Sequence, residues 1–266
     1  MINISFEATH NRETISTLKT EWRNSLTFPN ESYEEAVIDG CQHWVLKLEE
    51  KTIGYACVSK KHTLYQFYIS YKYLMHGTVV LEEFIKQRGT KKAIVGTNNP
   101  IYLSMIMHFQ KSIEIYGYTF KDTEDVSQKE RDVKFRVAET GDLEQLLNLD
   151  DDSEVSEESK KWLKKYFGDC ISKGVIFVLK KNNEIIAYLE VRTSTLRFKI
   201  TSLGVVVSPK YRNQGYGSYL LVKGKSIGKS RHSETICGCN MKNIISRKTI
   251  EKSGFRILHL SLLANL

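Results

Sequence analysis

The residues best suited to chemistry in this 266-residue chain lie in a turn between two regular elements. An apolar, β-branched strand is predicted over residues 203–207, and the turn from Arg212 to Gly217 leads into a helix that begins near Ser218. A glycine-containing turn that enters a helix leaves backbone N–H groups unpaired at the positive end of the helix dipole. Glycine at 215 and 217 also removes side chains that would hold a phosphate at a distance. The turn therefore predicts a site for an anion such as a diphosphate.

Two other phosphate-binding patterns do not fit this region. A dinucleotide-binding fingerprint would need its third glycine at Leu220. The runs 224–226 and 228–230 look like the end of a nucleotide-binding P-loop, but Tyr219 and Lys223 stand where that loop requires its first glycine. The sequence thus excludes both kinds of nucleotide site.

The elements around the turn occur twice along the chain. Strand pairs are predicted at 44–48 with 53–58 and at 175–179 with 185–191. Residues 67–81 align with residues 205–219, with four identities in fifteen positions and Gly77 on Gly215. We therefore expect two related α/β units, residues 1–130 and residues 131–266.

Charge and composition narrow the class of protein. The net charge of +8 is concentrated in residues 201–266, which carry 11 basic and 2 acidic side chains. This excess fits either a nucleic-acid surface or a phosphate-bearing cofactor.

No apolar run approaches the roughly 18 to 20 residues that a membrane helix needs, and no secretory leader is evident. The five scattered cysteines predict reduced thiols in the cytoplasm, and Cys237-x-Cys239 lacks the further ligands of a metal site, so no metal is expected.

The pattern Arg-x-x-Gly-x-Gly after a strand ending in Val-x-Pro resembles the acyl-CoA-binding motif of the Gcn5-related N-acetyltransferases (GNAT). A second element of that family follows in order, with Asn243, Ser246 and the helix end at 251–255. The resemblance covers about residues 133–258. The N-terminal half resembles a decayed copy, because Leu74 and Val79 stand in the places of Arg212 and Gly217.

This resemblance implies an α/β (α+β) fold of two GNAT-like units, each a mixed, mostly antiparallel twisted sheet flanked by helices. It implies an acyltransferase that moves an acetyl group from acetyl-CoA directly to a primary amine. The backbone of Val205 and Val207 would bind the pantetheine arm and polarise the thioester carbonyl, and the N-terminal copy would not bind the cofactor. The residues expected at the acetyl-CoA site are Val205, Val206, Val207, Arg212, Asn213, Gln214, Gly215, Tyr216, Gly217, Ser218, Asn243 and Ser246.

Direct transfer needs a base for the ammonium proton and an acid for the leaving thiolate. The family often supplies the acid from a tyrosine, but here that place holds Ile250. Either Tyr219 or Ser246 takes that role, or the thiolate leaves without help. Glu190, on the second strand of the second pair, is the candidate base through a water, and a solvent-facing structural carboxylate is the alternative.

The acceptor is expected to be a small-molecule or peptide amine. Carboxylates at 150–152, 154, 157 and 158 would attract a cation, although they equally suit a solvated loop before a helix. The alternative function is a non-catalytic acyl-CoA-binding or regulatory module. Neither a nucleic acid nor a membrane is an expected partner, and the oligomeric state, including a homo-oligomer, stays open.

Overall fold

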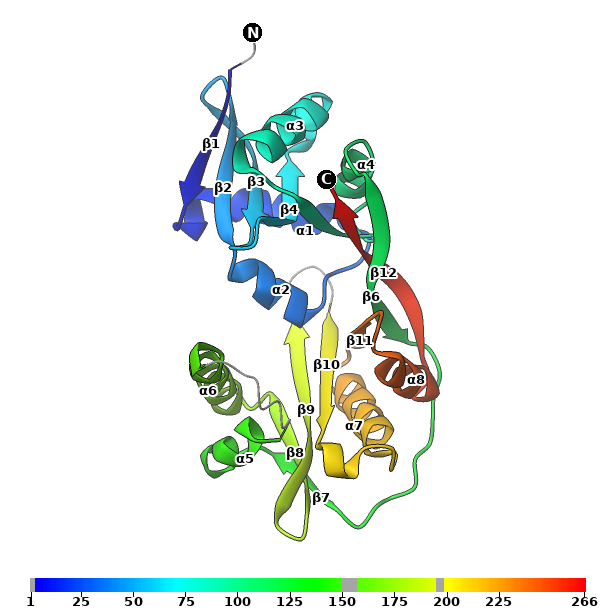
Figure 1. Ribbon diagram of the computed structural model, residues 1–266. Helices are drawn as coiled ribbons and strands as arrows, with labels where there is room; N and C mark the ends of the chain where they lie inside the picture. The colour runs from blue at the N-terminus through cyan, green and yellow to red at the C-terminus, as the bar shows by residue number, and fades with distance from the viewer. Residues whose placement is uncertain (1–2, 150–156, 195–198) are drawn as a thin grey trace. The chain divides into compact units, whose positions relative to one another are not determined.

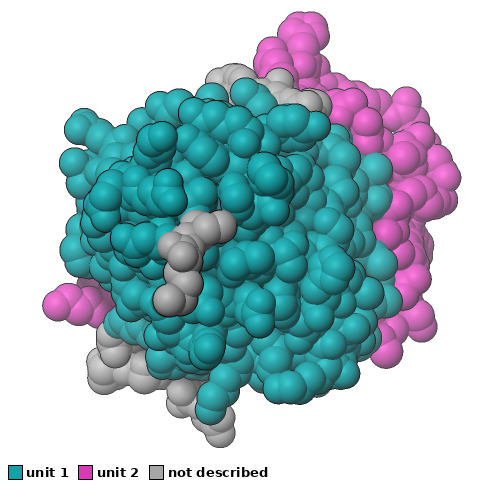
Figure 2. Space-filling view, turned by 90° about the horizontal axis from the view of Figure 1, so that it is seen from above, with its two compact units in different colours: residues 1–119, 240–242, 258–266 teal, residues 120–239, 243–257 magenta. Residues whose placement is uncertain are grey.

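The computed structural model describes residues 3–149, 157–194 and 199–266 (Figure 1). The chain forms two compact units, coloured separately in Figure 2. Unit 1 comprises residues 1–119, 240–242 and 258–266, and unit 2 comprises residues 120–239 and 243–257. The division at residue 130 expected from the sequence falls inside unit 2, and the last nine residues, Leu258–Leu266, belong to unit 1.

Each unit has the predicted architecture, a mixed α/β structure with a mostly antiparallel sheet flanked by helices. The strands of unit 1 are β1 (Ile4–Thr9), β2 (Gln42–Leu48), β3 (Lys51–Val58), β4 (Thr63–Ile69), β5 (Lys92–Gly96), and parts of β6 (Ser112–Asp122) and β12 (Phe255–Asn265). Its helices are α1 (Ser16–Ser25), α2 (Ser32–Asp39), α3 (Gly77–Arg88) and α4 (Pro100–Ile106). The strand order β1-β2-β3-β4-β5-β12 contains one parallel pair, β4 with β5.

Unit 2 repeats this arrangement. Its strands are β7 (Lys134–Val137), β8 (Ile176–Lys181), β9 (Glu184–Ser194), β10 (Ile200–Val207) and most of β11 (Glu234–Asn240). Its helices are α5 (Leu143–Leu147), α6 (Glu157–Ser172), α7 (Tyr216–Ser230) and α8 (Ile244–Lys252). The order β11-β10-β9-β8-β7 again contains one parallel pair, β10 with β11.

The two predicted strand pairs and the repeated strand–turn–helix segment are all present. The pairs are β2 with β3 and β8 with β9. In unit 1, β4 leads through a 3₁₀ turn at Tyr71–His76 into α3, and in unit 2, β10 leads through a 3₁₀ turn at Pro209–Tyr211 into α7. The aligned glycines both lie at a helix start, but Gly77 is the first residue of α3 with φ −56°, whereas Gly215 is the N-cap of α7 with φ +81°, and α7 begins at Tyr216 rather than near Ser218.

Helices cover both faces of the unit 2 sheet. Phe167 of α6 packs edge-on against Tyr188 of β9, with ring centroids 5.5 Å apart. On the other face α7 approaches β10 so closely that a Cβ on Gly224 would lie 2.7 Å from the Leu203 side chain. Because neighbouring residues of a strand point to opposite faces, Gly204 and Val206 face α6 whereas Leu203 and Val205 face α7.

A buried ion pair anchors the start of unit 2. Arg136 of β7 donates from Nη1 and Nη2 to the two carboxylate oxygens of Asp142, at 2.6 and 2.9 Å, and Asp142 Oδ2 also accepts from the backbone N–H of Glu139. These donors favour the ionised carboxylate, and hydrogen bonding to Arg136 is the main reason why the pKa of Asp142 is lowered. Asp142 is only 4% exposed, so removing its charge would leave Arg136 with only the exposed Glu139 carboxylate, 3.7 Å away, as a counter-charge.

We therefore expect Asp142→Asn to lower the free energy of unfolding by about 3 kcal/mol at pH 7. Because the folded pKa lies below the unfolded value, this stabilisation is present above the ordinary carboxyl pKa and is lost as the pH falls through the lower folded value. Urea unfolding at pH 7 and at pH 3 measures both effects. Glu144→Gln, which removes an exposed carboxylate 3.4 Å from Lys164, is the control and should change little.

Candidate functional site

Strand β10 loses one of its two neighbours half-way along its length. It pairs with β11 from Ile200 to Leu203, whereas its pairing with β9 continues to Val207. On the β11 side the backbone groups of Val205 and Val207 therefore have no partner strand, and of these the carbonyl of Val207 accepts from Arg212. An extended chain can bind there as an additional strand would.

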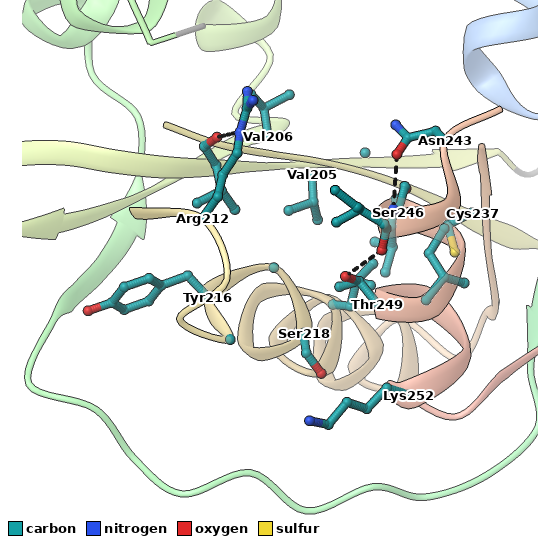
Figure 3. Close-up of a pocket in the computed structure, with 18 of the residues that line it drawn as sticks. Val205, Val206, Arg212, Tyr216, Ser218, Cys237, Asn243, Ser246, Thr249 and Lys252 are labelled. Atoms are coloured by element: carbon teal, nitrogen blue, oxygen red, sulfur yellow. Dashed lines mark hydrogen bonds between the residues drawn. The ribbon is translucent and has the colours of Figure 1, made fainter. Parts of the chain in front are cut away.

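A cavity of about 530 Å³ lies at this place, between β10, the start of α7 and α8 (Figure 3). It brings together all but one of the residues predicted for acetyl-CoA: Val205, Val206, Val207, Arg212, Asn213, Gly215, Tyr216, Gly217, Ser218, Asn243 and Ser246. The exception is Gln214, which does not line the cavity. Its backbone carbonyl accepts from Arg131 Nη1 at 2.9 Å, and its side-chain amide donates to the carbonyl of Lys210 at 3.3 Å.

The N-terminus of α7 forms one end of the cavity. Among the described residues no side chain caps this helix, and its first turn contains no acidic residue. The Arg212 side chain lies back along the strand, with Nε donating to the carbonyl of Val207 at 3.1 Å. The free N–H groups and the helix dipole thus make this end attractive to an anion.

The two glycine positions of the turn favour glycine for different structural reasons. Gly215 has φ +81°, a conformation that favours glycine, and a Cβ there would lie 2.7 Å from Arg131 Nη2. A Cβ on Gly217 would lie 3.2 Å from Thr249 Cγ2 and 3.8 Å from Val207 Cγ2, and both of these residues line the cavity. The sequence interpretation, in which both glycines simply clear space for phosphate, describes Gly217 better than Gly215.

The start of α8 forms the wall opposite β10. Asn243 caps this helix, with Oδ1 accepting from the backbone N–H of Ser246 at 3.0 Å (Figure 3). The Thr249 hydroxyl donates to the carbonyl of Ile245 at 2.9 Å. Within the described part of the chain the Ser246 hydroxyl has no hydrogen-bond partner, so it is free to donate to a ligand.

Glu190 lies beside the cavity on the α6 face of the sheet. It pairs in register with Gly204, which lines the cavity, and a Cβ on Gly204 would be 3.6 Å from the Glu190 Cβ. Because Gly204 has no side chain, the backbone of β10 is not covered on the α6 face at this point. A small group approaching from the α6 face would meet the cavity next to the Glu190 carboxylate.

Both carboxylate oxygens of Glu190 have partners. The Tyr166 hydroxyl donates to Oε2 at 2.7 Å, and Arg192 Nε donates to Oε1. Arg192 also donates from Nη2 to Cys170 Sγ at 3.0 Å. Burial, together with the neighbouring Glu190 carboxylate, raises the pKa of Tyr166, so this tyrosine stays a neutral donor at physiological pH. The carboxylate is therefore held in one orientation, with lone pairs left for a water.

Tyr219 lies away from the cavity, unlike the other two predicted catalytic residues. It is 2% exposed and is not among the lining residues. Its hydroxyl donates to Glu130 Oε2 at 3.0 Å, and Lys223 donates to the other Glu130 oxygen at 2.8 Å. Burial and the bond to Glu130 raise the pKa of Tyr219. This geometry gives Tyr219 a structural role.

We accordingly expect Tyr219→Phe to change the turnover of any acetyl transfer by less than about threefold, since it removes one hydrogen bond worth about 1 kcal/mol to stability. Steady-state kinetics and a thermal melt measure the two effects. A loss of a hundredfold or more in kcat with an unchanged melt would instead assign Tyr219 to the chemistry.

Much of the positive charge near the turn is neutralised within unit 2. Lys225 is buried and lies 2.6 Å from Asp122, and its ammonium also donates to the carbonyl of Ser253. Lys229 pairs with Asp125. Lys223 and Lys225 belong to the positive charge excess of residues 201–266, but both are paired with acidic residues about a hundred positions earlier, so they add little free charge at the turn.

In unit 1 side chains fill the corresponding place. Asn99 caps α4 by accepting from the backbone N–H of Tyr102, as Asn243 does for Ser246. Tyr102 thus takes the place of Ser246, is 2% exposed, and donates from its hydroxyl to the carbonyl of Leu64 in β4 at 3.4 Å. The matching segments Asn99–Tyr102 and Asn243–Ser246 were a further sign of the repeat in the sequence, but they lie beyond the aligned residues 67–81 and 205–219.

The predicted acidic cluster lies outside the described side chains. Residues 150–156 are outside the described residues, and the side chains of Glu157 and Glu158 are not described. None of the helices in the described ranges is long and apolar enough to span a membrane.

Comparison with known protein families assigns both halves of the chain. Residues 11–123 match the acetyltransferase (GNAT) domain, and residues 143–255 match the acetyltransferase (GNAT) family. The chain belongs to the GNAT family, with two domains in tandem. The tandem arrangement predicted from the sequence is confirmed. No match was found among curated proteins.

Solved structures with the same fold span nearly the whole tandem GNAT protein. An acetyltransferase from the GNAT family of Colwellia psychrerythraea aligns with a TM-score of 0.88 at 17% identity, over 98% of this chain and 99% of that one. A tandem GNAT protein from the clavulanic acid biosynthesis pathway aligns with a TM-score of 0.65 at 10% identity, over 99% and 98%. A GCN5-related N-acetyltransferase from Sphaerobacter thermophilus aligns with a TM-score of 0.61 at 14% identity, over 98% and 94%.

Proposed function

We propose that unit 2 of this tandem GNAT protein transfers an acetyl group from acetyl-CoA to a primary amine of a small molecule or peptide. The observation that carries this proposal is the cavity that follows the unpaired edge of β10 and ends at the uncapped N-terminus of α7. One end offers strand-like hydrogen bonds and the other offers anion binding. A pantetheine arm joined to a diphosphate has the matching chemistry.

The residues present fit acetyl-CoA in a definite direction. Free amides at the start of α7 would hold the diphosphate, and the backbone of Val205 and Val207 would bind the amide groups of the arm. The thioester would then lie toward Leu203 and Cys237, the last residues at which β10 and β11 still pair. The amide groups of β10 are placed to polarise the thioester carbonyl.

We assign the proton transfers to residues beside that end of the cavity. Glu190, next to the bare Gly204, takes the ammonium proton of the acceptor through a water, and the free amine attacks the thioester carbonyl carbon. The carbon–nitrogen bond forms and the carbon–sulfur bond breaks. The departing thiolate takes a proton from the Ser246 hydroxyl, which solvent restores, or directly from solvent.

Unit 1 has a supporting role in this proposal and does not bind acetyl-CoA. Tyr102 and Met105 are buried where the ligand would lie, and a Cβ on Gly77 would be 2.5 Å from Met105 Cε. Titration calorimetry is expected to give one acetyl-CoA per chain.

The five cysteines are free thiols, which suits a reducing compartment, and we propose a cytoplasmic location.

A non-catalytic acyl-CoA-binding module is the second candidate. The observations that favour it are Ile250 in place of the family tyrosine and the two partners already held by Glu190. Thiol release followed with DTNB over a panel of diamines, polyamines and lysine peptides separates the two functions. Release that requires both acetyl-CoA and an amine supports the enzyme. Tight binding of acetyl-CoA with no release for any amine supports the binding module.

A further inference from the structure

The segment between the two family matches takes part in building the cavity region of unit 2. Residues 124–142 lie outside both GNAT matches. We call residues 124–131 the connecting segment. Its carboxylates Glu124, Asp125 and Glu130 pair with Arg256, Lys229 and Lys223, respectively. These ion pairs connect the segment to α7 through Lys223 and Lys229 and to β12 through Arg256.

Arg131, at the end of the connecting segment, lies on the glycine turn itself. Its guanidinium donates to the carbonyl of Gln214 and lies 4.9 Å from the centroid of the Tyr216 ring. Its Nη2 atom is 2.7 Å from the position that a Gly215 Cβ would take. No carboxylate pairs with Arg131 among the described residues, so it brings an uncompensated positive charge to the turn.

A second cavity, of about 420 Å³, adjoins this arginine. Its lining consists of Val126, Ser127, Gln128, Lys129, Arg131 and Lys252. Three of these residues are cations and none is an acid. Lys252 lines both cavities, and Figure 3 shows its side chain on the same side of α7 as Ser218. Neither Lys129 nor Lys252 has an ion-pair partner within the described ranges.

We propose that this second cavity binds the 3′-phosphate of CoA. The inference rests on the proposed binding of acetyl-CoA and deepens it. CoA carries a phosphate monoester on the ribose, one short link from the diphosphate. With the diphosphate at the start of α7, Arg131 would lie beside both phosphate groups, and Lys252 lines both cavities. A doubly charged phosphate would neutralise cations that are otherwise unpaired.

The test compares CoA with dephospho-CoA by titration calorimetry on the full-length chain. We expect the wild type to bind CoA at least about tenfold more tightly, as one charge-assisted contact would give. Lys252→Gln and Arg131→Gln should each reduce this ratio toward unity, because each weakens the binding of CoA more than that of dephospho-CoA. Because the ratio is taken within one variant, any general damage to the turn affects both ligands and cancels.

Lys248→Gln is the matched control, since Lys248 is an exposed lysine of the same helix that lines neither cavity. It should keep the wild-type ratio. Equal affinity of the wild type for CoA and dephospho-CoA, or a ratio that survives in the Lys252→Gln/Arg131→Gln double variant, would overturn the proposal while leaving acetyl-CoA binding intact. If the wild type binds neither ligand, the proposed function itself fails.

Discussion

Replacing Gly217 by valine is expected to weaken acetyl-CoA binding about 30- to 100-fold, the effect of overpacking a closely fitted site. The new Cβ would already be 3.2 Å from Thr249 Cγ2, and the two further methyl groups would lie between Thr249 and Val207, inside the cavity. Valine has a better helix propensity than glycine, so α7 should remain folded. Titration calorimetry measures the affinity, and Gly217→Ala should give a smaller loss.

Gly168→Val provides the control for this experiment. Gly168 is also a helical glycine, in α6, and a Cβ there would meet nothing within 4 Å. It should leave acetyl-CoA affinity unchanged. Wild-type affinity in a folded Gly217→Val protein would show that the ligand does not occupy the cavity at the start of α7, and the proposed function would be wrong.

Replacing Glu190 by glutamine is expected to lower kcat by about 100- to 1,000-fold, the usual contribution of a general base. Glutamine keeps the size of the side chain and can still accept the hydrogen bond from Tyr166, but it cannot take up a proton. Acetyl-CoA should bind as before, because Glu190 does not line the cavity.

Two companion variants separate chemistry from structure at this position. Tyr166→Phe removes one hydrogen bond to Glu190 and should reduce kcat much less than Glu190→Gln does. Glu144→Gln, an exposed carboxylate on α5, should have no effect on kcat. A folded Glu190→Gln enzyme with near wild-type turnover would assign Glu190 to a purely structural ion pair with Arg192.

The sequence predicted those parts of the site that depend on residues close together along the chain. The turn from Arg212 to Ser218 and the strand before it are set by local patterns of glycine and β-branched residues. The exception within the turn is Gln214, whose backbone carbonyl accepts from Arg131, 83 residues earlier. A motif alone contains no information about such a partner.

The parts that could not be predicted depend on contacts between distant residues. The lysines of α7 contribute to the charge excess of residues 201–266, and the sequence does not show that their acidic partners are Asp122, Asp125 and Glu130, about a hundred residues away. Tyr219 was a candidate acid for the same reason, since its helix position did not reveal that its hydroxyl faces Glu130. A third example is the pairing of the C-terminal strand with β5, which places Leu258–Leu266 in unit 1.

The pairing of the C-terminal strand β12 with β5 of unit 1 determines the order in which the two units can finish folding during synthesis. Ser261–Asn265 pair with Lys92–Gly96 of β5, and Ala264 is fully buried in the core of unit 1. These residues emerge after all of unit 2 has been synthesised. Until then one edge of β5 has no neighbour and is open to pairing with a nascent chain nearby. The first half to be translated is therefore the last to be completed.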